Sequence, residues 1–80
     1  MYLGNDRPAR EPDVMIVLNE HLDRLLPTYL NGAADLVIEI VSPESIARDY
    51  GVKFQEYEAA GIREYWLIDS MRQQADIYRL

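Results

Sequence analysis

The stretch Leu36-Val-Ile-Glu-Ile-Val-Ser-Pro43 decides the fold that the sequence predicts, because it places one acidic residue inside a run of aliphatic side chains. Runs of this kind are typical of strands that are buried on both faces. An ionised carboxylate is costly to bury unless a cation, hydrogen-bond donors or a metal ion stabilise it. We therefore expect Glu39 to have a partner elsewhere in the chain.

The composition limits the size and class of the protein. The chain has 80 residues, 49% of them hydrophobic, which predicts one globular domain with a small core. The absence of cysteine excludes disulfides and thiolate metal sites and fits a reducing cytoplasm. We see no signal peptide or stretch of membrane-spanning length, so we expect a soluble cytoplasmic protein. The net charge of −6 disfavours simple binding to nucleic acid, but divalent cations in an acidic site would reverse the local sign.

The hydrophobic pattern predicts an irregular lead-in over residues 1–12, a short helix over residues 19–26, and four strands. The strands are expected over residues 14–18, 35–41, 64–69 and 75–79. The first two strands have apolar residues on both faces and should be buried. The fourth alternates weakly and should be an antiparallel, edge-like partner of the third.

A long helix is predicted between the second and third strands, over residues 43–60. Ser42 is its expected N-cap and Gly61 its left-handed C-cap, while Gly51 is a weak point inside it. The resulting fold class is α/β (α+β), a mixed sheet with the long helix packed on one face. The other face would be bare, so we expect a missing segment or a second chain to cover it.

One polar residue lies on the apolar stripe of this helix, whose members at helical spacing are Ile46, Tyr50, Phe54, Tyr57 and Ala60. Lys53 on that stripe should pack its stem against the core while its ammonium reaches an acid. Asp13 begins the first strand, and if that strand pairs with the second, its carboxylate can converge with Glu39. Two such carboxylates repel unless a cation lies between them, and Mg²⁺ or Mn²⁺ suits oxygen ligands.

Each of these residues also has a purely structural interpretation. Glu39 can face solvent on a half-exposed strand, Asp13 can serve turn chemistry after a proline, and Lys53 can be a surface lysine. Taken singly, none of the three decides between a site and a structural role. His21 has no second metal-type partner, so we assign it no chemistry.

Four blocks follow one another along the chain: Pro12-Asp13, Asp35-Leu-Val-Ile-Glu-Ile-Val-Ser-Pro43, Arg48-Asp-Tyr-Gly-Val-Lys-Phe-Gln-Glu-Tyr-Glu-Ala-Ala-Gly61 and Glu64-Tyr-Trp-Leu-Ile-Asp69. In this order they resemble the Uma-type restriction endonuclease family of the PD-(D/E)XK nuclease superfamily. The resemblance covers most of the chain from Pro12 to Leu80. It implies a restriction-endonuclease-like fold, a homodimer, and metal-dependent hydrolysis of DNA.

The resemblance also implies roles for individual residues. Asp13 and Glu39 would bind Mg²⁺ or Mn²⁺, and the backbone carbonyl of Ile40 would complete the metal shell. The superfamily lysine normally lies two residues after the second acid, where this chain has Val41, so its role is transferred to Lys53. The implied catalytic set is therefore the two acids and this lysine.

The same resemblance bears on how complete the domain is. Family members usually carry a helix and further strands before the Pro-Asp segment, so we expect residues 1–80 to be a single domain that is a fragment or a minimal version. The leading hypothesis is a metal-dependent endonuclease with DNA as its substrate. The alternative is a non-catalytic interaction or assembly module that retains the nuclease fold.

Overall fold

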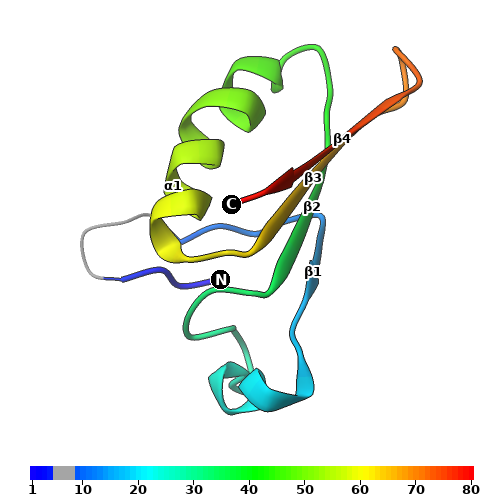
Figure 1. The fold of residues 1–80 in the computed structure, drawn as a ribbon. Helices are drawn as coiled ribbons and strands as arrows, with labels where there is room; N and C mark the ends of the chain where they lie inside the picture. The colour runs from blue at the N-terminus through cyan, green and yellow to red at the C-terminus, as the bar shows by residue number, and fades with distance from the viewer. Residues whose placement is uncertain (5–8) are drawn as a thin grey trace.

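The computed structural model describes residues 1–4 and 9–80, and within them four strands form one mixed sheet (Figure 1). The strands are β1 (Val14–Ile16), β2 (Leu36–Ile40), β3 (Glu64–Asp69) and β4 (Gln74–Arg79). They lie in that order across the sheet, with β2 and β3 parallel and each outer strand antiparallel to its neighbour. The predicted mixed sheet and the antiparallel fourth strand are confirmed. Residues 5–8 of the predicted lead-in lie outside the described residues.

The prediction of one long helix over residues 43–60 is wrong. The helical segment has 13 residues, a π-helical turn η2 (Arg48–Val52) followed by the α-helix α1 (Lys53–Ala60). Residues 43–45 form a turn instead, in which the Ser42 N–H donates to Ser45 Oγ at 2.9 Å. A serine hydroxyl offers the backbone a local alternative to helical hydrogen bonds, which accounts for the shorter helix. No helix within the described residues is long and apolar enough to cross a membrane.

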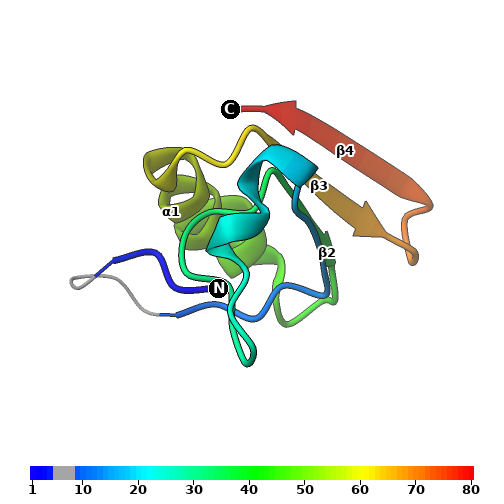
Figure 2. The ribbon, with the colours of Figure 1, turned by 90° about the horizontal axis from the view of Figure 1, so that it is seen from below.

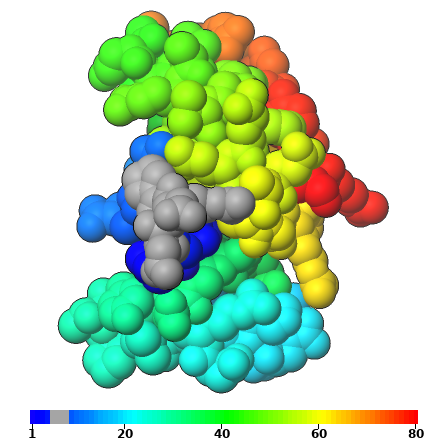
Figure 3. All heavy atoms as spheres, turned by 90° about the vertical axis from the view of Figure 1, so that its left-hand side faces the viewer, coloured from blue at the N-terminus to red at the C-terminus, as the bar shows by residue number. Residues whose placement is uncertain are grey.

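The hydrophobic core lies on the face of the sheet that α1 covers. Seen from below, α1 lies to one side of the strands (Figure 2). Figure 3 looks onto this covered side, with helical residues above and residues near 20–34 below. Tyr57 of α1 packs edge-on against Tyr65 of β3, with ring centroids 5.0 Å apart. The buried hydrophobic residues are Met1, Leu30, Ala34, Val37, Val41, Tyr57, Ile62, Tyr65 and Leu67.

The opposite, outer face of the sheet carries apolar side chains without cover from the described residues. One cross-strand row on this face joins all four strands and consists of Val14, Ile38, Trp66 and Ile77. Val14 is 45% exposed and Ile77 57% exposed at the two edges. A continuous apolar face of this kind is typical of a surface that another chain or segment covers.

The first strand differs from its prediction in both length and burial. It was expected to be buried over residues 14–18, but β1 spans three residues and all three are exposed. Its position at the sheet edge explains this, because its outward side chains lie on the open face and it has a neighbour on one side only. The short helix expected over residues 19–26 is present as the 3-10 helix η1 (Asn19–Arg24).

A pair of glycine substitutions tests the helix boundary. Gly61 has φ of 87° and ends α1, so Gly61→Ala should lower the free energy of unfolding by about 1 kcal/mol, because a side chain is strained there. Gly51 in η2 has no positive φ and open space around its Cβ position, so Gly51→Ala should be neutral or slightly stabilising. Urea denaturation measures both, and equal stability of the two variants would contradict the assigned boundary.

Candidate functional site

Glu39 is the acid whose burial the sequence made unusual, and the structure places it on the inner face of β2. Its residue is 2% exposed, with Val37 and Val41 buried on the same face. Oε2 is hydrogen-bonded to the Lys53 ammonium, and Oε1 accepts a hydrogen bond from the Asp13 N–H at 3.0 Å. The buried carboxylate therefore has a cation on one oxygen and a backbone donor on the other.

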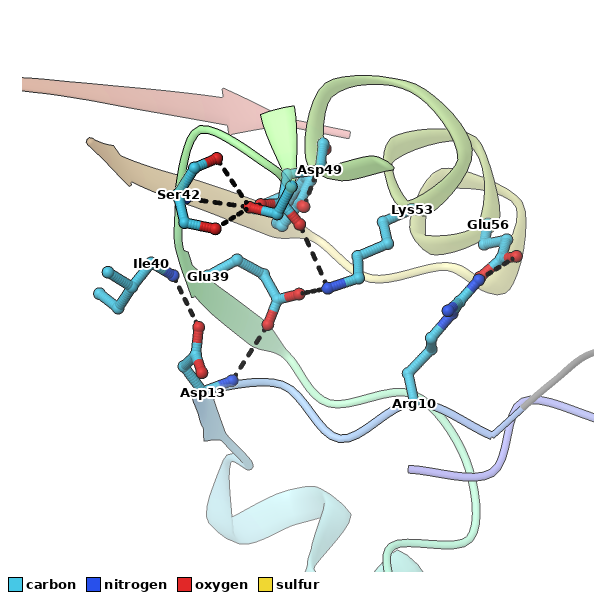
Figure 4. A network of polar contacts seen from close by, with 10 residues as sticks. Arg10, Asp13, Glu39, Ile40, Ser42, Asp49, Lys53 and Glu56 are labelled. Carbon is cyan, nitrogen blue, oxygen red and sulfur yellow. Dashed lines mark hydrogen bonds and ion pairs between the residues drawn. The ribbon is translucent and has the colours of Figure 1, made fainter. Parts of the chain in front are cut away.

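Asp13 is exposed and lies just before β1, opposite the end of β2. The register that pairs Val14 with Ile38 places Asp13 beside Glu39. Asp13 Oδ2 accepts a hydrogen bond from the Ile40 N–H at 2.7 Å, while its own N–H donates to Glu39. These reciprocal contacts bring together the two acids that the sequence singled out (Figure 4).

Lys53 is the first residue of α1 and reaches across to β2. Its ammonium pairs with Glu39 and also lies 3.2 Å from Asp49 Oδ1. Burial alone would lower the pKa of Lys53, but the contacts with the Glu39 and Asp49 carboxylates outweigh it and hold that pKa above its usual value. The side chain is 20% exposed, so it remains an ammonium directed at the acids rather than at bulk solvent.

Asp49 and Ser45 belong to the same network, and the sequence interpretation missed both. Asp49 is 1% exposed, and Ser45 Oγ donates to its Oδ2 at 2.6 Å. Spacing carried a signal that went unused, since Asp49 precedes Lys53 by four residues, as an ion-paired acid on one helix face would. The buried hydroxyl of Tyr57 has no hydrogen-bond partner among the described residues, and burial raises its pKa.

The helix register changes at η2. Ile46 was expected on the buried stripe but is 39% exposed, while Ser45, one residue earlier, is buried. Ile46 instead lines a small cavity of about 150 Å³ at the end of β3, together with Pro43, Asp69, Met71 and Arg72. Asp13, Glu39 and Lys53 do not line this cavity, so the acid-lysine cluster is a separate, edge-of-sheet site.

The donor set at this site is made of oxygen atoms. Asp13 and Glu39 supply carboxylates. The Ile40 N–H donates to Asp13, whereas the next N–H along β2, that of Val41, donates to Ile68 in β3. Because the N–H and C=O of one strand residue face the same neighbour, the Ile40 carbonyl faces the Asp13 side. Carboxylates and carbonyls are the ligand types that a hard divalent cation prefers, although both Glu39 oxygens here have protein partners. No group of three or more His, Asp or Glu side chains placed to hold a metal occurs within the described residues.

Another buried acid lies at the opposite end of β2. Asp35 accepts hydrogen bonds from the Leu18 N–H at 2.8 Å and contacts His21 Nδ1 at 2.8 Å, so it fastens η1 to the sheet. Burial would raise the pKa of Asp35, but the hydrogen bonds from Leu18 and His21 and the nearby charge of Arg24 outweigh it and lower that pKa. The histidine thus has a structural partner.

Comparison with known proteins gives a family. The Uma2 family, described as "Putative restriction endonuclease", matches the chain over residues 1–80. The protein belongs to this family of restriction-endonuclease-like proteins, which confirms the resemblance found in the sequence. Among curated proteins, none matches the chain.

The Asp35 contacts predict a pH-dependent contribution to stability. A pKa lowered in the fold stabilises the folded state above the usual value of 3.8, and the contribution disappears as pH falls through the lowered value. Asp35→Asn should therefore cost about 1–3 kcal/mol near neutral pH, since donors lose a charged acceptor. Urea denaturation should show the difference from wild type shrinking below pH 3.8. A constant difference across that range would contradict the assignment.

Proposed function

We propose that this protein is a metal-dependent endonuclease that hydrolyses phosphodiester bonds of DNA. The observation that carries the proposal is the continuous set of contacts from Lys53 through Glu39 to Asp13. These are the residues for which the family resemblance implies catalysis, and family membership supports the restriction-endonuclease-like class. The catalytic set in this proposal is Asp13, Glu39 and Lys53.

The oxygen atoms at the sheet edge would hold the cation. Asp13, Glu39 and the Ile40 carbonyl would ligate Mg²⁺ or Mn²⁺, and the exposed position of Asp13 leaves that side open to a phosphate group. When bound, the ion supplies Lewis acidity and offsets the negative charge of the phosphate. It would also reverse the local sign of an acidic site, which a chain of net charge −6 needs in order to receive DNA.

Lys53 would act as a hydrogen-bond donor. Its raised pKa keeps the amine protonated near neutral pH, so it does not serve as a general base. An ammonium held beside the two acids can steady negative charge that develops on the phosphate oxygens or orient the attacking water. Glu39 and Asp13, whose carboxylates are linked through backbone N–H groups, position the reacting group relative to this ammonium.

Metal binding and cleavage test the proposal together. Calorimetric titration of the wild-type chain with Mn²⁺ should release or absorb heat at one class of site, and the Asp13→Ala/Glu39→Ala double variant should give none. Mg²⁺-dependent nicking of plasmid DNA should be lost in the same variant and abolished by a chelator in wild type. The double variant should lose metal binding and nicking because it lacks both carboxylate ligands.

The control is Glu58→Gln, which removes an exposed acid of α1 away from the network. It should bind Mn²⁺ and nick DNA as wild type does, since overall charge changes little. Identical null heats for wild type and the double variant would reject the metal site. Cleavage that persists in the double variant would reject the assigned residues.

A second candidate function is a non-catalytic assembly module, and the apolar outer face of the sheet favours it. Val14, Ile38, Trp66 and Ile77 form a row that a second copy of the chain can cover through the same row, as in a two-fold homodimer. This candidate predicts stable oligomers without metal-dependent cleavage. A homodimeric nuclease would instead form oligomers and also cleave DNA in the presence of metal.

Sedimentation velocity separates these outcomes. Wild type should sediment as a dimer, and Ile77→Lys should shift it to a folded monomer, because a charge would be buried in the apolar contact. Val52→Lys is the matched control, since Val52 is 53% exposed but lies in η2 rather than on the outer face. A wild-type monomer that stays folded on dilution would reject both the homodimer and the assembly module.

A further inference from the structure

Asp49 carries a buried carboxylate that the proposed reaction does not use. The residue is 1% exposed, Ser45 Oγ donates to its Oδ2 at 2.6 Å, and the Lys53 ammonium lies 3.2 Å from its Oδ1. Its backbone carbonyl accepts a hydrogen bond from the Tyr65 hydroxyl at 2.9 Å. Side chain and backbone are both anchored, so the carboxylate presented to Lys53 has a fixed position.

The π-helical turn explains how this carboxylate comes to face the lysine. Ser45, Asp49, Lys53 and Tyr57 recur every four residues, and the side chain of each is buried or mostly buried. In a continuous α-helix, three steps of four residues would turn the face by about 120°. In η2 the Lys53 N–H donates to the Arg48 carbonyl five residues earlier. This wider turn rotates the chain by a smaller angle per residue than an α-helix does. The four-residue repeat therefore stays on the inner face.

We propose that Asp49 is a positioning residue that, together with Ser45, fixes the Lys53 ammonium against Glu39. A free lysine side chain samples many rotamers, and ordering it costs conformational entropy. Carboxylates on two sides of the ammonium confine it to one place, and Figure 4 shows Lys53 reaching toward Glu39 and Asp49. The catalytic consequence of this role rests on the proposed nuclease function, whereas the positioning itself does not.

Asp49 does not share the role of the two proposed metal ligands. Its Oδ2 accepts the hydrogen bond from Ser45, while its Oδ1 is buried without a hydrogen bond within the described residues and lies 3.2 Å from the Lys53 ammonium. Asp13, in contrast, is exposed at the sheet edge, and Glu39, although enclosed like Asp49, is hydrogen-bonded to the Asp13 backbone N–H at that edge. Asp49 therefore acts through Lys53 and touches neither DNA nor the reacting atoms.

The test compares Asp49→Asn with wild type in the full chain without metal. Nitrogen-15 NMR of the lysine side chains measures how fast the Lys53 ammonium protons exchange with water. Exchange in Asp49→Asn should be roughly tenfold faster, because the ammonium loses one of the two carboxylates with which it is paired. With Mg²⁺ and plasmid DNA, kcat should fall by roughly tenfold at unchanged KM, because the substrate contacts remain.

Two further variants keep the test decisive. Ser45→Ala keeps the Asp49 carboxylate but removes the hydrogen bond to its Oδ2, so Lys53 exchange should become faster by a smaller factor. This variant replaces Asp49→Asn in the test if Asp49→Asn does not fold. Asp35→Asn is the matched control, since it also removes a buried, paired acid but lies at the other end of β2. The Lys53 exchange rate and the kcat of this variant should equal those of wild type.

The outcomes distinguish this inference from the proposed function. Unchanged Lys53 exchange in a folded Asp49→Asn variant, or in Ser45→Ala where the former does not fold, would overturn the positioning role. Faster exchange in a chain that cleaves no DNA would support the positioning role while rejecting the nuclease function. A KM increase without loss of kcat would also overturn the inference, because it would place Asp49 in substrate binding.

Discussion

The pairing of Glu39 with Lys53 is the interaction on which the arrangement of this small protein depends. A carboxylate that is 2% exposed inside a strand is strongly destabilising if its cation is removed. The cation comes from α1, so the helix must lie with its first residue over the end of β2. The other carboxylate oxygen takes the backbone N–H that precedes β1. One side chain therefore links the central strand to an edge strand and to the covering helix.

The network around this pair contains more acids than bases. Glu39 and Asp49 share one ammonium, and Asp13 adds a third acid at the exposed rim. Backbone and hydroxyl donors supply the remaining contacts, from Asp13, Ile40 and Ser45. Of these three acids, Asp13 at the rim is the one that solvent reaches. Enclosed acids hold the lysine, whereas the rim acid faces outward.

Sequence reasoning recovered the parts of this fold that depend on strong local patterns. The apolar runs predicted β2 and β3, and Gly61 was correctly predicted to end α1. The apolar run around Glu39 predicted a cation, a hydrogen-bond donor or a metal ion as its partner, and the structure supplies Lys53. It failed where a non-α backbone changed the phase of the helix. An α-helical repeat places Ile46 in the core and gives no reason to bury Ser45, because the π-helical turn and the serine turn before it are not visible in apolar spacing. Asp49 was missed for a different reason, because its position four residues before Lys53 is visible in the sequence but was not used.

The exposed sheet face and the acidic site are physically connected through β1. This strand has three residues, lies at an edge, and is exposed along its whole length, so it belongs to the least stabilised part of the sheet. Asp13 immediately precedes it and is held by reciprocal hydrogen bonds to β2 alone. Val14, the next residue, begins the apolar row on the outer face. Covering that row would bury Val14 and restrict β1, and it would thereby fix the Asp13 carboxylate relative to Glu39. The proposed assembly through the outer face and the proposed chemistry at the sheet edge would therefore be coupled through one short strand rather than being independent alternatives.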